Sequence, residues 1–110
     1  MMRLNRKLTL EAPQRLADGM GGYVETWAAL GTLWGEVKPA SGAERGGVGG
    51  PLARVRLKIT LRAAPYGAPS RPKPEQRLRD GARIYSVLAV EDSDPRGRYL
   101  TVIAQEEVQA

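Results

Sequence analysis

The feature that most constrains this fold is a strict alternation of apolar and polar, mostly cationic, side chains near the middle of the chain. The pattern alternates Val55, Leu57, Ile59 and Leu61 with Arg54, Arg56, Lys58, Thr60 and Arg62. Successive side chains of a strand point to opposite faces, so this period of two predicts one strand with an apolar and a cationic face. Together with the residues directly flanking this pattern, about twelve residues at about 3.3 Å each would extend about 40 Å. Because a small barrel has no need of such a length, we expect part of this strand to bend or project as an arm.

Five further segments alternate or are rich in β-branched and aromatic residues, and each predicts a strand. They are residues 7–13, 22–30, 32–38, 82–90 and 98–107. Two arrangements remain open around Gly31, because the segments on either side of it form either a hairpin or one strand bent at the glycine. Segment 82–90 is apolar on both faces, which predicts a central strand. It is expected to pair in antiparallel sense with 98–107 through a tight turn at 93–97.

Glycine and proline gather between these segments. Residues 39–51 hold five glycines in thirteen positions, and with little apolar surface to offset the entropy of ordering, this segment should be mobile in an isolated subunit. Four prolines lie within residues 65–74, which excludes a helix and predicts an extended loop over 64–77. The residues 78–81 are expected to form a turn.

These segments together predict an all-β fold. We expect a small antiparallel β-barrel or sandwich of six to seven strands with long loops, in one domain over residues 1–110. Phenylalanine is absent, so the large apolar anchors are expected among Trp27, Trp34, Tyr23, Tyr66, Tyr85 and Tyr99. Core packing is the ordinary role for the two tryptophans; a base-stacking platform or an exposed interface anchor is the alternative.

The residue inventory excludes several kinds of chemistry. The chain has no cysteine and no histidine, so disulfides are excluded, as are the zinc and iron–sulfur sites that depend on these ligands. Asp92 and Asp94 are typical of a turn, and the glycines of 46–50 lack the Gly-Lys-Ser/Thr of a phosphate-binding loop. We therefore expect a protein that is not an enzyme and needs no cofactor or metal. No apolar stretch approaches the about 20 residues of a membrane span, so no membrane contact is expected.

The charge of the chain leaves two interpretations open. The formal net charge is +5, and thirteen of the 17 basic residues are arginine. Arginine suits bidentate contacts with carboxylate or phosphate groups. The excess charge indicates either a well-solvated basic surface or a surface that contacts nucleic acid or an acidic partner.

Short motifs follow one another in a recognisable order along nearly the whole chain. They comprise Leu4, Leu8 and Leu10; Asp18, Gly21 and Gly22; Thr26 and Trp27; Trp34; Pro39, Ser41, Gly42 and Glu44; Ile59 and Arg62; Arg77, Gly81 and Tyr85; and Leu100 and Glu106. In this order the chain resembles the head-tail joining (head-closure or stopper) proteins of tailed phages and gene transfer agents. It departs from their pattern at 46–50, where glycines replace a helix-compatible stretch, and at Ala63-Ala64, where an aromatic residue is usual.

The resemblance implies a β-barrel that assembles as a homo-oligomeric ring of six or twelve copies. It implies a portal-adaptor ring as the partner on the head side and a tail-terminator or tail-tube protein on the tail side. Packaged double-stranded DNA would run through the ring, which helps to close the channel. The implied location is a virion or gene transfer agent particle, assembled in the bacterial cytoplasm.

Candidate subunit-interface or DNA-channel residues lie on the cationic strand and in the two long loops. They are Ser41, Gly42, Glu44, Arg45, Arg54, Arg56, Lys58, Arg62, Arg71 and Lys73. Two other functions remain open. The basic charge supports a small nucleic-acid-binding module of OB-like or SH3-like fold, and the size and β content suit a tail-terminator ring protein.

Overall fold

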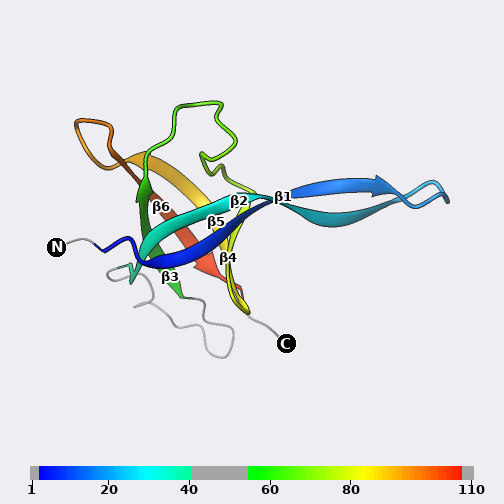
Figure 1. The fold of residues 1–110 in the computed structure, drawn as a ribbon. Coiled ribbons are helices and arrows are strands. Elements are labelled where there is room, and N and C mark those ends of the chain that lie inside the picture. Colours follow the sequence, from blue (N-terminus) through cyan, green and yellow to red (C-terminus); the bar gives the residue numbers. More distant parts are fainter. Residues whose placement is uncertain (1–2, 41–54, 108–110) are drawn as a thin grey trace.

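The computed structural model describes residues 3–40 and 55–107, which form a six-stranded antiparallel sheet. The strands are β1 (Arg6–Ala17), β2 (Tyr23–Pro39), β3 (Arg56–Arg62), β4 (Arg77–Asp80), β5 (Arg83–Asp92) and β6 (Tyr99–Glu106). They follow the order β1-β2-β3-β6-β5-β4, and β4 pairs back onto β1 to close a barrel (Figure 1). The predicted all-β antiparallel fold is confirmed. No helix within the described ranges is long and apolar enough to span a lipid bilayer.

The barrel interior is filled by alternate residues of its strands. The buried cluster comprises Leu8, Leu10, Leu57, Ile59, Leu61, Leu78, Tyr85, Val87, Val102 and Ala104. On β3 the predicted alternation is confirmed, because Leu57, Ile59 and Leu61 are buried while Arg56 and Arg62 are exposed. Tyr85 is the one aromatic side chain in this cluster of described residues.

The strand that projects from the barrel is not the predicted one. β3 has seven residues, and all of them pair with β6, from Arg56↔Gln105 to Arg62↔Tyr99. The projecting arm is formed by β1 and β2, which pair from Arg6↔Gly35 out to Ala17↔Tyr23 (Figure 1). β1 pairs with β4 only at 9–11, and β2 pairs with β3 only at 35–39. Within residues 3–40 and 55–107, the rest of β1 and β2 pair only with each other, so their outer parts leave the barrel as a two-stranded hairpin.

A bend in β2 marks the place where the arm begins. Leu10 pairs with Gly31 and Glu11 with Ala29, so Leu30 is an extra residue in β2. Such a bulge bends the strand and increases its twist. Gly31 has a φ of 152°, which side-chain-bearing residues rarely adopt. Of the two arrangements that the sequence left open, the structure has the single bent strand.

The tip of the arm is a tight turn closed by one carboxylate. β1 runs past Pro13, where the sequence predicted its end, to Ala17. The Asp18 carboxylate then accepts hydrogen bonds from the backbone N–H groups of Met20 (2.7 Å) and Gly22 (3.0 Å). These two backbone donors hold the pKa of Asp18 below its ordinary value, so this side chain is ionised at neutral pH.

Two other expectations are corrected. The residues predicted as a turn at 78–81 belong mostly to strand β4, which completes the barrel between β1 and β5, and the turn itself lies at Gly81–Ala82. Trp34 is 52% exposed rather than packed in the core. Trp27 is half-buried, and the guanidinium of Arg77 stacks 4.0 Å from its ring centre.

The buried Tyr85 predicts a loss of stability at alkaline pH. Burial, and next the hydrogen bond that its hydroxyl donates to Asp80 (2.9 Å), raise the pKa of Tyr85 from 10.0 to about 12. The folded state thus favours the neutral phenol, whereas the unfolded chain releases this proton near pH 10. We expect the unfolding midpoint in urea to fall between about pH 10 and pH 12, and to fall less in Tyr85→Phe. Tyr66→Phe, at an exposed ring, should show the same fall of the unfolding midpoint with pH as the wild type. An equal fall in both variants would contradict this assignment.

Candidate functional site

The outer surface of β3 and the neighbouring end of β2 form a basic face, which we define as Lys38, Arg56, Lys58 and Arg62. All four side chains are exposed. Lys38 and Lys58 lie directly opposite each other in the register, and like charges in this position destabilise a sheet. Among the described residues, Lys38 has Glu36 at 3.6 Å, and the other three have no carboxylate at ion-pair distance. A surface that concentrates uncompensated cations at a cost to the sheet is suited to an acidic or phosphate-bearing partner.

Several basic residues elsewhere on the barrel are paired within the chain. Arg83 contacts both oxygens of Glu106 at 2.7 and 2.8 Å. This contact lowers the pKa of Glu106 and raises that of Arg83. Arg6 pairs with Asp80 in the same region. These pairs distinguish Arg6 and Arg83 from the cations of β3, which have no carboxylate at ion-pair distance among the described residues.

Arg71 is placed differently from the other candidate residues. It is 8% exposed, its Nη1 donates to the carbonyl of Ala64 at 3.0 Å, and its guanidinium stacks 3.9 Å from the ring centre of Tyr66. Asp92 lies 3.6 Å away. Arg71 thus forms contacts within the chain, and these hold the proline-rich loop against the end of β5. Its assignment to a subunit interface or to the DNA channel stays a prediction. Lys73 in the same loop is exposed.

Half of the predicted candidate set is not covered by the structure. Ser41, Gly42, Glu44, Arg45 and Arg54 lie outside the described residues. The residues of the cationic strand that form part of the basic face are therefore Arg56, Lys58 and Arg62. Lys38 joins them because β2 pairs with β3, a neighbour that the pattern within one strand does not indicate.

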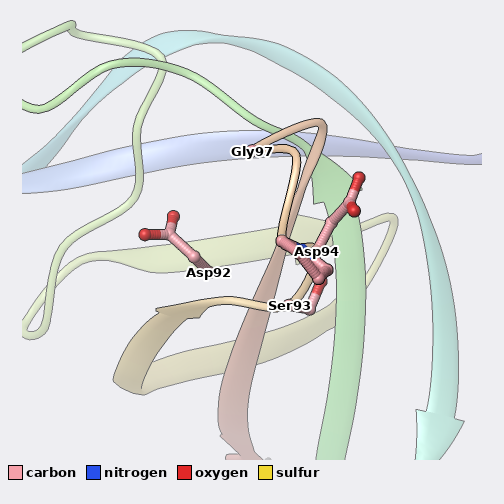
Figure 2. Close-up of a pocket in the computed structure, with 5 residues that line it drawn as sticks. Asp92, Ser93, Asp94 and Gly97 are labelled. Carbon is pink, nitrogen blue, oxygen red and sulfur yellow. The ribbon is translucent and has the colours of Figure 1, made fainter.

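The turn between β5 and β6 lines an open pocket with Asp92, Ser93, Asp94, Pro95 and Gly97. Figure 2 shows the carboxylates of Asp92 and Asp94 pointing away from each other. Asp94 binds within the turn, accepting hydrogen bonds from the Arg98 Nε (2.8 Å) and the backbone N–H of Arg96 (3.1 Å), which lower its pKa. Two divergent carboxylates do not form an acid–base pair, and turn chemistry explains Asp94. In the described part of the chain no three acidic residues gather where they would hold a metal ion.

The root of the arm is attached to β4 by a shared carboxylate. Glu11 accepts hydrogen bonds from the Nε groups of Arg77 (2.6 Å) and Arg79 (3.2 Å). Burial opposes ionisation of Glu11, but the hydrogen bonds and charges of the two arginines outweigh it and hold its pKa below the ordinary value. Because Arg77 also stacks on Trp27 of β2, this network joins both strands of the arm to the barrel.

Replacing Glu11 by Gln should loosen this attachment. Hydrogen bonds to charged groups contribute about 1.5–3 kcal/mol, so the free energy of unfolding should fall by about that amount near pH 7. A lowered carboxyl pKa stabilises the fold above the unfolded value of 4.5 and loses this effect as the pH falls through the folded value. Urea unfolding should therefore give a difference between wild type and variant that shrinks below pH 4.5. Glu25→Gln, an exposed site on the arm, is the control; a gap that does not change with pH would argue against this role.

A family model described as phage head completion protein matches residues 1–107. The chain belongs to the phage head completion protein family. The resemblance to head-tail joining proteins is thus confirmed at the level of the family, which gives this head completion protein a structural role in a phage-like particle. Such a role entails contacts with other head and tail proteins.

Two solved structures are similar to this head completion protein over its whole length. One is a chain of the virion of a native gene transfer agent particle, with 52% identity, full coverage of both chains and a TM-score of 0.81. The other is the protein SF1141 from Shigella flexneri 2a, with 22% identity, coverage of 100% and 98%, and a TM-score of 0.72. The second similarity concerns the fold alone. No match was found among curated proteins.

The arm is the surface that sequence reasoning missed. Its turn, Asp18-Gly19-Met20-Gly21-Gly22, lies between the segments 7–13 and 22–30, which the sequence predicts as separate strands without indicating a hairpin. The available signal was the glycine-rich turn at 18–22 between two segments that both predict strands.

Proposed function

We propose that this head completion protein is a ring subunit of the connector between head and tail, in a phage or gene transfer agent particle assembled in the bacterial cytoplasm. The observation that carries the proposal is the 52% identity, over the full length of both chains, to a chain of a gene transfer agent virion. In this role the protein acts by assembly and not by catalysis.

In the proposed ring, copies of the chain stack between the portal-adaptor ring and a tail-terminator or tail-tube protein. The fold supports such an assembly, because the basic face and the arm are separate surfaces of one subunit. Contacts between two different patches repeat around an axis and close into a ring when the rotation closes. A ring of six or twelve copies is the proposed assembly.

We further propose that the ring helps to close the DNA channel. The exposed cations Arg56, Lys58 and Arg62 support a surface that faces phosphate groups or an acidic neighbouring ring. The same observation favours direct DNA binding as a second candidate function. In that case the purified chain should bind duplex DNA with an affinity whose logarithm falls by about 0.9 per phosphate contact for each decade of salt. If the chain does not bind DNA, or if its binding does not depend on salt, the partner of this surface is the acidic neighbouring ring.

Particles made without this protein test the proposed function. We expect DNA-filled heads that lack tails or lose their DNA, counted by electron microscopy, and tailed particles when the wild-type gene is supplied again. Amine-directed cross-linking of wild-type particles should yield a ladder of multimers of this chain that ends at the ring size. A normal yield of tailed, filled particles without the protein would contradict the proposal.

A further inference from the structure

The outer end of the arm exposes apolar side chains that nothing in the described chain covers. Leu16 and Val24 lie opposite each other in the register, so they share one face of the hairpin, and they are 54% and 52% exposed. Met20 in the turn is 88% exposed. We call these three residues and Asp18 the arm tip. A two-stranded hairpin is marginally stable by itself in water, and exposed apolar groups of this kind mark contact surfaces.

The same chain has an apolar groove on the barrel. It opens between β2 and the end of β3, where their pairing stops at Gly35↔Leu61. Its lining is Thr32, Leu33, Trp34, Leu61 and Arg62, and its volume is about 220 Å³. An apolar cavity of about 150 Å³ holds a benzene molecule, so this groove has room for a side chain of the size of Met or Leu. Trp34, one of the lining residues, is 52% exposed.

The charges of the arm tip and the groove are complementary. Asp18 is the single charged residue between Ala17 and Val24, and its lowered pKa accompanies two hydrogen bonds from the turn's own backbone. At the groove, Arg62 has no carboxylate partner among the described residues. Lys7 lies opposite Trp34 in the register. An anionic, apolar tip therefore matches an apolar groove with a cationic rim.

We propose that the arm tip of one copy inserts into the groove between β2 and β3 of a second copy. The proposal rests on the proposed ring and names the contact that builds it. The tip does not reach its own groove, because the strand from Tyr23 to Thr32 holds them about 30 Å apart. Tip and groove are different patches, so the contact is heterologous and each copy engages the next one around the ring.

Engineered disulfides test this contact directly, because the chain has no cysteine of its own. In the variant Met20→Cys/Thr32→Cys, only a contact of tip with groove brings the two Cα atoms within the about 7 Å that a disulfide needs. We expect oxidised particles to give a ladder of products beyond the dimer on a non-reducing gel. The matched control is Met20→Cys/Ala82→Cys, in which the second cysteine lies in the exposed β4–β5 turn away from the groove. Aligned pairs react at high effective concentration, so the test variant should give about tenfold or more ladder product than the control.

The outcomes separate this contact from the ring itself. A ladder of equal strength in both variants, or dimers alone, would overturn the proposal, since random collision or a contact of tip with tip would explain it. If amine cross-linking of wild-type particles gives multimers and the cysteine pair does not, the ring stands and the arm contact is wrong. If the cysteine introduced in place of Met20 forms no disulfide but is shielded from a thiol reagent, a different virion protein covers the arm, which also overturns the proposal.

Failure of the double variant to enter particles does not end the test. The purified variant at about 1 mM, a concentration that populates even millimolar contacts, is then oxidised after circular dichroism has established that it is folded. A ladder specific to the Thr32 position supports the contact, and its absence in the folded chain counts against it.

Discussion

Reversing two charges of the basic face, with Arg56→Glu and Arg62→Glu, is expected to lower the yield of tailed, DNA-filled particles by about 100-fold or more. Loss of one partner of a buried charge pair costs about 2–5 kcal/mol, and every 1.4 kcal/mol is a factor of ten in an equilibrium. Both side chains are exposed on the outside of the barrel and have no ion-pair partner among the described residues. The fold should therefore survive, because the apolar face of β3 is unchanged.

Counts of tailed and tailless heads by electron microscopy measure this effect, together with the melting temperature of the purified variant. The control is Arg3→Glu/Arg96→Glu, which makes the same change of net charge at two exposed positions outside the strands β2 and β3. If the Arg56/Arg62 variant gives the same particle counts as the wild type, the basic face takes no part in assembly. A matching loss in the control would point to net charge rather than to this surface.

Replacing Gly35 by Val should be among the most destabilising single changes on the barrel. Gly35 is buried, and a Cβ at this position would lie 2.7 Å from Leu61 Cδ2, 3.0 Å from the backbone oxygen of Thr60 and 3.3 Å from Leu8 Cδ1. Leu61 and Leu8 belong to the core, and the Thr60 oxygen belongs to the strand that pairs with β2 here. Overpacking of this kind costs about 1–3 kcal/mol or more. Each kcal/mol lowers the melting temperature by roughly 4–8 °C in a domain of about this size.

Thermal unfolding followed by circular dichroism measures this effect. Ala29→Val makes a similar increase in volume on the same strand at an exposed position, so its melting temperature should stay within about 2 °C of wild type. A Gly35→Val variant that melts as the wild type does would mean that β2 and β3 are not packed as closely as the structure has them.

Local patterns in the sequence determined the fold class and much of the basic face. The alternation around Leu57, Ile59 and Leu61 predicted which side chains are buried, because opposite faces of a strand follow directly from backbone geometry. The turn at 93–97 was predictable for a similar reason, since Asp94 closes it with donors only a few residues away. The order of the short motifs was sufficient to indicate the family, because this order is read along the chain and does not depend on which residues are in contact.

The tertiary structure alone decided which strands find partners. Glu11 meets Arg77 and Arg79 across 66 and 68 residues of sequence, and Arg71 is buried by the loop and strand around it. The arm projects because β1 and β2 extend beyond the residues that pair with β4 and β3. Trp34 lies on the outer face of β2, whereas Leu33 and Val37 of the same strand pack against the core. Strands pair through hydrogen bonds between residues that are distant in the sequence. The pattern within one segment therefore does not show where the strand beside it ends. The sequence by itself therefore determined the two faces of each strand, and the closure of the barrel determined which of these faces remain free for assembly.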